Sequence, residues 1–179
     1  MGNPEPITVM SVVSFYVLLI AAIACVFDVK SARIPNWLTM SAVIVGLIFH
    51  TFSRQAQGFG VAAMGLTLGV AVFFPLFALR AMGAGDLKLL GALGTWVGPV
   101  AVLWVALYAA IAGGVLAILV MLWRGYLRQG LRNIRTLLRF WSLEGLKPLP
   151  EISLDSPKSV RLPYAVPIAV GLVVALWQR

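Results

Sequence analysis

The chain has 179 residues, of which 61% are hydrophobic and 11% are charged, and its formal net charge is +8 at pH 7. Soluble domains contain about 45–50% apolar residues, so this composition excludes an ordinary soluble fold. An excess of basic residues can indicate nucleic-acid binding. In so hydrophobic a chain it more often fixes membrane topology, and we expect no nucleic-acid partner. The single cysteine, Cys25, excludes a disulfide framework and a multi-cysteine metal site.

Apolar segments that are long enough to form helices recur along the whole chain. A helix of about 20 apolar residues crosses the hydrocarbon core of a bilayer, which is about 30 Å thick. The uncharged stretch 89–123 is too long for one ordinary span, and Gly98-Pro99 is a natural break within it. Spans are predicted at residues 7–27, 37–52, 58–79, 86–98, 100–123 and 163–177. We therefore predict one all-α, polytopic membrane domain, residues 1–179, with six transmembrane helices.

The lysines and arginines sort into alternate loops of this six-span arrangement. All but Arg54 and Arg179 lie after the first, the third or the fifth span. Because basic loops stay in the cytoplasm, these three loops are predicted to be cytoplasmic and both termini to be non-cytoplasmic. A five-span arrangement would scatter the basic residues over both sides.

The loop between the fifth and sixth spans contains a helical repeat of apolar and basic positions. The apolar positions are Leu127, Leu131, Ile134, Leu138 and Trp141, and the arginines between them are Arg124, Arg128, Arg132, Arg135 and Arg139. This pattern predicts a basic amphipathic helix that lies on an anionic lipid surface. Such a helix either anchors the loop to the membrane or receives a substrate or partner.

Two of the six acidic residues lie at membrane boundaries. Asp28 ends the first span and Asp86 begins the fourth, and the predicted topology places both near the cytoplasmic side, where they could meet. Two carboxylates held close together do not both ionise easily, so one can keep a proton while the other acts as a base. Such a pair could activate a water and protonate a peptide carbonyl.

The alternative for each aspartate is a local partner. Asp28 would then pair with Lys30 or Arg33. Asp86 would pair with Lys88 or interact with the dipole of the helix that it begins. Charge and position alone leave both interpretations open.

Glycines precede Asp86 in the sequence Gly83-Ala84-Gly85-Asp86. They permit unusual backbone angles and let another chain come close to the carboxylate. Gly83-x-Gly85-Asp86 resembles the GxGD motif of intramembrane aspartic peptidases, and the longer GAGDLKLLGALGTWVG resembles the type IV prepilin peptidases. The stretch from Asp28 to Ile34-Pro35-Asn36 is similar to the other aspartate motif of that family. Leu162-Pro163-Tyr164-Ala165-Val166-Pro167 is similar to the entry of its final helix.

This resemblance covers about residues 10–177 and implies an aspartic endopeptidase of the bacterial cytoplasmic (inner) membrane. Asp28 and Asp86 would be its catalytic pair. The substrate would be a prepilin or pseudopilin whose short basic leader is cut at the cytoplasmic membrane face. The supporting motif residues would be Gly83, Gly85, Lys88, Ile34, Pro35 and Asn36. No cofactor and no metal are expected.

Larger members of that family have an added N-terminal cytoplasmic region with paired CxxC motifs, and they also methylate the new N-terminus. Those cysteines are absent from this sequence, so we expect peptidase activity without methyltransferase activity. This short form is similar to the peptidases of Flp-type tight-adherence pili.

Two other classes of function compete with the peptidase. One is a small ion-coupled transporter, because ionisable residues in membrane segments often mark ion paths. The other is a noncatalytic pilus-assembly membrane protein that keeps the fold and binds pilins without cutting them. Both aspartates lie near one membrane surface and both are intact, which favours the peptidase over either alternative.

Overall fold

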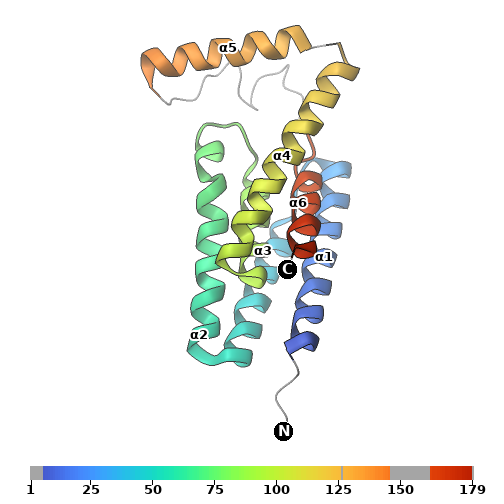
Figure 1. The fold of residues 1–179 in the computed structure, drawn as a ribbon, viewed down its shortest axis with the longest axis vertical. Helices are drawn as coiled ribbons and strands as arrows, with labels where there is room; N and C mark the ends of the chain where they lie inside the picture. The colour runs from blue at the N-terminus through green and yellow to red at the C-terminus, as the bar shows by residue number, and fades with distance from the viewer. Residues whose placement is uncertain (1–5, 126, 146–161, 179) are drawn as a thin grey trace.

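The computed structural model describes residues 6–125, 127–145 and 162–178, which form helices joined by short connections (Figure 1). The helices are α1 (Pro6–Ser31), α2 (Asn36–Ala78), α3 (Ala84–Val97), α4 (Pro99–Trp123), α5 (Leu127–Glu144) and α6 (Ala165–Trp177). The described residues include no β-strand. The predicted all-α fold is therefore confirmed for this part of the chain.

The lengths of the helices limit which of them can cross a bilayer. By length and composition four helical segments can do so, and these are Val12–Ser31, Asn36–Ser53, Gln55–Ala78 and Pro99–Trp123. The helices α3 and α6 contain 14 and 13 residues. At about 1.5 Å per residue both are shorter than a hydrocarbon core of about 30 Å. The structure thus supports a multi-pass membrane protein, and the six-span arrangement remains a prediction.

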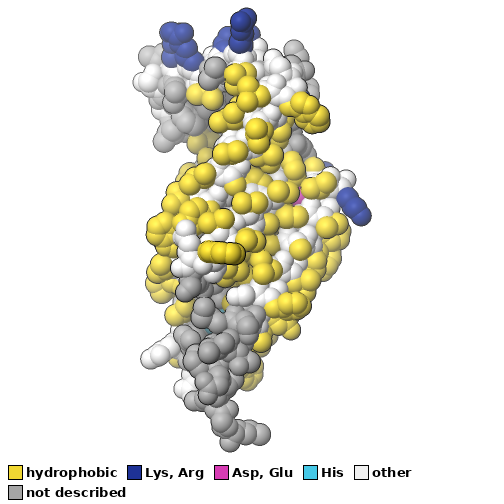
Figure 2. Space-filling view, turned by 45° about the vertical axis from the view of Figure 1, so that its right-hand side comes forward, with side chains coloured by type: hydrophobic (Ala, Val, Ile, Leu, Met, Phe, Trp, Pro, Cys, Tyr) yellow, Lys and Arg dark blue, Asp and Glu magenta, His cyan; other side chains and the backbone are white. Residues whose placement is uncertain are grey.

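The outer surface of the bundle is hydrophobic along its sides. In Figure 2 apolar side chains cover the flanks, and the visible lysines and arginines lie at the top of the view and at one place on its right-hand side. Several large apolar side chains on the surface are more than half exposed, among them Phe15, Phe52 and Trp123. An apolar surface of this extent promotes association in water, whereas lipid chains can cover it.

The helix α2 contains both of the apolar segments predicted at 37–52 and 58–79, and it reverses direction between them (Figure 1). Gln55 has a left-handed φ of 52°, which is uncommon for a residue with a side chain and lets the chain turn. A Cβ atom added at Gly46 would meet the side chain of Trp96, and one added at Gly69 would meet the backbone of Leu90. Because Trp96 and Leu90 both belong to α3, both arms of α2 pack against that helix.

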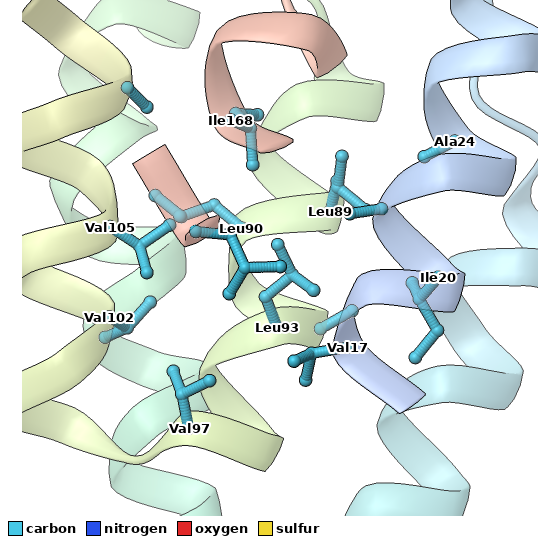
Figure 3. Close-up of a cluster of buried hydrophobic side chains, with 14 of the residues drawn as sticks. Val17, Ile20, Ala24, Leu89, Leu90, Leu93, Val97, Val102, Val105 and Ile168 are labelled. Atoms are coloured by element: carbon cyan, nitrogen blue, oxygen red, sulfur yellow. The ribbon is translucent and has the colours of Figure 1, made fainter. Parts of the chain in front are cut away.

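The helix α3 lies at the centre of the bundle, and ten of its 14 residues are buried. Figure 3 shows Leu89, Leu90 and Leu93 of α3 among side chains of α1, α4 and α6. Because protein covers its backbone, α3 can be shorter than the membrane is thick without exposing polar groups to lipid. It ends at Gly98, which has a left-handed φ of 83°, and Pro99 begins α4 at the predicted break.

Aromatic rings pack around the C-terminal end of α3. The ring of Trp96 is stacked on Tyr16 of α1, with 5.4 Å between ring centroids, and on Phe49 of α2, with 5.6 Å. Its indole N–H donates to the carbonyl oxygen of Ala42 at 2.9 Å, so the one polar atom of this buried side chain is satisfied. The stack joins α1, α2 and α3 near the C-terminal end of α3.

The helix predicted between the last two apolar segments is present as α5, and it runs across one end of the bundle (Figure 1). Its exposed arginines are Arg128, Arg132, Arg135 and Arg139. The side chains of Leu131, Leu138 and Trp141, on which the predicted apolar face depends, lie outside the described part of the structure, as do residues 146–161 of the same loop. The amphipathic surface therefore stays a prediction.

The backbones of α2 and α3 approach most closely at Gly65 and Gly94, where a Cβ atom on Gly65 would overlap the Gly94 carbonyl oxygen. We predict that Gly65→Ala destabilises the bundle by about 1–3 kcal/mol, because the helices must separate to admit the methyl group. Gly60→Ala in the same helix is the matched control, since a Cβ there meets no atom within 4 Å. Thermal unfolding in detergent measures both, and equal stability of the two variants would contradict the close approach.

Candidate active site

Asp28 lies in the last turn of α1, and only 8% of its side chain is exposed. Among the side chains that the structure describes, no other charged one is buried. Its Oδ2 atom accepts a hydrogen bond of 2.9 Å from the backbone N–H of Ala165, the first residue of α6. A buried carboxylate is costly unless it is hydrogen-bonded, and the dipole at a helix N-terminus favours negative charge. The start of α6 therefore stabilises Asp28 in its buried position.

The chain turns directly after Asp28. Ala32 has a left-handed φ of 48°, and its N–H donates to the Asp28 carbonyl oxygen at 2.8 Å, which ends α1. Pro35 restricts the preceding Ile34 to extended backbone, and Pro35 itself is the N-cap of α2, with φ −67° and ψ 137°. This short connection brings Ile34, Pro35 and Asn36 to the same cavity as Asp28.

The connection from α2 to α3 also begins with a left-handed residue, Arg80, with a φ of 56°. The Arg80 N–H donates to the Phe77 carbonyl oxygen and the Ala81 N–H donates to that of Leu76, both at 2.9 Å. These two bonds form the Schellman pattern that satisfies the last carbonyls of a helix, where glycine is usual. An arginine in this conformation costs about 1–2 kcal/mol. The turn leads to Gly83, which is the N-cap of α3.

Asp86 is the third residue of α3, and its side chain is half-buried. The carboxylate accepts a hydrogen bond from the backbone of Gly83. An acidic side chain at this position that returns to the N-cap N–H is one half of a capping box, and the helix dipole also favours it. Asp86 is therefore anchored by its own helix start and needs no basic partner.

Asp28 and Asp86 line one open cavity of about 1050 Å³. They are close enough for the charge of Asp28 to act on Asp86. The six supporting residues named from the sequence also line this cavity, and they are Gly83, Gly85, Lys88, Ile34, Pro35 and Asn36. The structure thus brings both aspartate motifs together, although 58 positions separate the two aspartates (86 − 28).

Two direct contacts join the motifs. A Cβ atom added at Gly85 would lie 3.2 Å from Cβ of Ile34, so the absence of a side chain at Gly85 lets the two segments pack closely. The Lys88 ammonium donates a hydrogen bond of 2.9 Å to the side-chain oxygen of Asn36. Lys88 is therefore bonded to the other motif rather than held beside Asp86.

The cavity wall combines apolar and basic side chains around the two carboxylates. Phe27, Phe77, Met82 and Leu162 supply the large apolar groups, and Arg33 and Arg80 supply positive charge. Lys30 and Arg33, the local partners considered for Asp28, are exposed, whereas Asp28 is buried. Two carboxylates in one open cavity can bind a water and exchange protons with it and with a second reactant.

Sequence reasoning did not predict the role of the α6 start. The Ala165 N–H donates a hydrogen bond to Asp28. The Ala165 carbonyl oxygen accepts a hydrogen bond of 3.3 Å from the Cys25 thiol. Pro163 and Pro167 mark the start of a helix in the sequence. Nothing in their spacing indicates that Ala165 contacts Asp28, which lies 137 positions earlier. A backbone donor carries no sequence signal at all, because every residue other than proline has one.

In the described part of the chain, no group of three or more His, Cys, Asp or Glu side chains lies close enough to hold a metal ion.

Comparison with known proteins assigns the chain to a family. The model of the type IV leader peptidase family matches residues 15–118, which is more than half of the chain and includes both aspartates. The chain belongs to the type IV leader peptidase family. No solved structure matches the chain.

Curated proteins that the chain resembles have names that agree with this family. A prepilin leader peptidase/N-methyltransferase of Pectobacterium carotovorum is 33% identical over 107 residues, which is 56% of this chain and 37% of the relative. One of Burkholderia pseudomallei is 38% identical over 107 residues, or 34% of its length. The type 4 prepilin-like proteins leader peptide-processing enzyme of Escherichia coli O78:H11 is 32% identical over 123 residues, or 45% of its length. The matched part thus spans less than half of each relative.

The contact between Ile34 and Gly85 predicts that cysteines at these positions form a disulfide. The 3.2 Å between the two Cβ positions is only slightly below the 3.5–4.5 Å range of disulfides. We expect Ile34→Cys with Gly85→Cys, in a Cys25→Ser background, to oxidise readily and to resist alkylation until reduced. Ile34→Cys paired with Gly60→Cys is the control. Free thiols in the test pair after oxidation, measured by mass spectrometry, would show that the motifs are not in contact.

Proposed function

We propose that this protein is an intramembrane aspartic endopeptidase that removes the short basic leader from prepilins or pilin-like proteins. The observation that supports this most strongly is the meeting of Asp28 and Asp86 in one open cavity at the end of the bundle. Family membership and the printed names of the relatives agree with that reaction.

In the proposed reaction the two carboxylates share one proton. The ionised carboxylate takes a proton from a water, whose oxygen adds to the scissile carbonyl carbon, while the protonated carboxyl donates its proton to the carbonyl oxygen. The tetrahedral intermediate then collapses, the C–N bond breaks, and a proton returns to the departing amine. Because the pair titrates as a unit, we assign acid and base to the pair and not to Asp28 or Asp86 alone.

The surroundings of the pair suit an extended peptide. The backbone of a substrate helix is inaccessible because its N–H and C=O groups are bonded within the helix. Gly83 has no side chain beside Asp86, where an added Cβ atom would lie 3.3 Å from Oδ2 of the carboxylate, so a second backbone can approach the carboxylate there. The apolar part of the wall, Phe27 and Phe77 among it, suits the apolar segment that follows a prepilin leader.

The membrane arrangement that fits this function has six spans, with α3 and α6 as the short ones. Basic residues follow the first, third and fifth spans, so the cavity, the α2–α3 connection and α5 would face the cytoplasm and both termini the opposite side. The exposed arginines of α5 then lie where anionic lipid headgroups would meet them. The leader would be cut at this cytoplasmic face.

Asp28→Asn and Asp86→Asn should each lower the rate of leader removal by about 10²-fold or more, because neither amide can act as acid or base. Purified protein in bilayers would be mixed with a prepilin, and leader removal followed by mass spectrometry. Asp155→Asn, which lies outside both motifs, is the matched control and should cleave at the wild-type rate.

Three outcomes of that experiment separate the candidate functions. Wild-type cleavage with two inactive aspartate variants supports the peptidase. Cleavage at the wild-type rate by either variant would disprove the paired mechanism. No cleavage by the wild type, across several prepilins and Flp-type pilins, would favour a noncatalytic assembly protein or an ion-coupled transporter.

The proposed orientation predicts which side of the membrane reaches single cysteines in a Cys25→Ser background. Ser31→Cys, Ala81→Cys and Thr136→Cys should react with an impermeant maleimide from the cytoplasmic side, and Ser53→Cys only from the other side. All four positions are exposed in the structure, so burial does not limit the reaction. Labelling of Ser53→Cys from the same side as Ser31→Cys would rule out the six-span arrangement.

A further inference from the structure

Both peptide groups of Ala165 are bonded to α1 close to the candidate site. Its N–H donates to Oδ2 of Asp28 at 2.9 Å, and its carbonyl oxygen accepts from the Cys25 thiol at 3.3 Å. Ala165 is fully buried, and Ile168 in the next turn of α6 is fully buried as well. The position of the Ala165 N–H, in the peptide group that joins Tyr164 to Ala165, therefore decides where the Asp28 carboxylate can lie.

The residue before Ala165, Tyr164, is held by contacts that do not involve α1. Its ring lies edge-on to Phe73 of α2, with 5.8 Å between ring centroids and 74° between ring planes. On the α4 side it fills a slot that exists only because residue 113 is glycine. A Cβ atom at Gly113 would lie 2.7 Å from Cε2 and 2.9 Å from the hydroxyl oxygen of Tyr164.

The same ring lies near the second aspartate. The charge of Asp86 acts on the Tyr164 hydroxyl, so the tyrosine lies within electrostatic range of one carboxylate while the next residue bonds the other. Neither Tyr164 nor Gly113 is among the described residues that line the cavity, whereas Leu162 is. The ring therefore stands behind the site, where it can affect the geometry of the pair without touching a substrate in the cavity.

We propose that Tyr164 is a positioning residue, whose ring, seated in the slot at Gly113, places the Ala165 N–H against Asp28 and so sets the geometry of the aspartate pair. This inference rests on the proposed peptidase function, because it concerns the geometry of that reaction. The ring is one residue from the hydrogen bond that it controls. The Ala165 N–H belongs to the planar peptide group that joins Tyr164 to Ala165, so movement of Tyr164 is passed directly to that donor.

Two neighbouring glycines of α4 allow a matched test. Gly113→Ala adds a methyl group against the Tyr164 ring, whereas a Cβ atom at Gly114 meets no atom within 4 Å. Both substitutions improve helix propensity by the same amount. Any difference between the two variants therefore comes from the contact with Tyr164 and not from the helix itself.

We expect Gly113→Ala to lower kcat for leader removal by roughly 10–100-fold, because misplacement by a fraction of an ångström to 1 Å is costly in a preorganised site. KM should stay within roughly 2-fold of the wild type, since neither residue contacts the cavity. Gly114→Ala should change neither constant. Equal kcat values for the two variants would overturn the proposal, and so would a loss that appears only in KM.

A double-mutant cycle identifies the partner of Gly113. Tyr164→Leu should itself lower kcat, and adding Gly113→Ala to it should cause little further loss, because the methyl group then has no ring to displace. Tyr164→Phe, which keeps the ring, should retain most of the wild-type kcat. Independent, multiplicative losses from Gly113→Ala and Tyr164→Leu would show that the glycine does not act through the tyrosine. If Tyr164→Phe is as slow as Tyr164→Leu, the hydroxyl and not the ring is responsible, and the proposed role of the ring is wrong.

The controls separate this proposal from the proposed function. If the wild type does not cleave, the peptidase assignment fails. If the wild type cleaves and Asp28→Asn does not, but Gly113→Ala behaves as Gly114→Ala does, only the positioning role fails. Thermal unfolding in detergent is measured for each variant. If Gly113→Ala does not insert stably, the comparison of Tyr164→Leu with Tyr164→Phe decides the question alone.

Discussion

Direct backbone contact between α2 and α3 is the constraint on which the rest of this structure depends. At Gly65 and Gly94 there is no room for even a Cβ atom, and Gly69 packs in the same way against Leu90. In a membrane, association between helices comes from close packing rather than from expulsion of water, so small residues at the contact are what allow it. The α2 reversal near Gln55 adds a second arm to this contact, which encloses α3 in protein.

The starts of α3 and α6 hold the two carboxylates of the candidate site. Asp86 is bonded to the backbone of Gly83 and lies at the positive end of the α3 dipole, whereas Asp28 is bonded to the backbone at the start of α6. Each carboxylate therefore depends on a different helix N-terminus. Their common cavity exists because α3 and α6 both begin at the end of the bundle where α1 stops.

The chain turns around the cavity through uncommon backbone conformations. Ala32 and Arg80 both adopt left-handed φ values, although each has a side chain, and both line the cavity. Such conformations persist only where the surrounding packing determines them, and they are frequent at functional sites. Here they end α1 and α2 abruptly, which keeps the connections to Pro35 and Gly83 short and the two aspartate motifs in contact.

The apolar segments by themselves predicted a helical, multi-pass membrane protein, because long apolar runs and the Gly98-Pro99 break are local properties of the sequence. The two aspartates could also be named from the sequence, since Asp28 and Asp86 stand in recognisable motifs at span boundaries. Only the tertiary structure decided that α2 folds into two arms around α3, and that Ala165 bonds Asp28. It alone also placed Tyr164 in a slot at Gly113. These features depend on backbone N–H groups and on glycines that leave room for a neighbour. Neither kind of feature has a residue pattern that identifies its partner in the sequence.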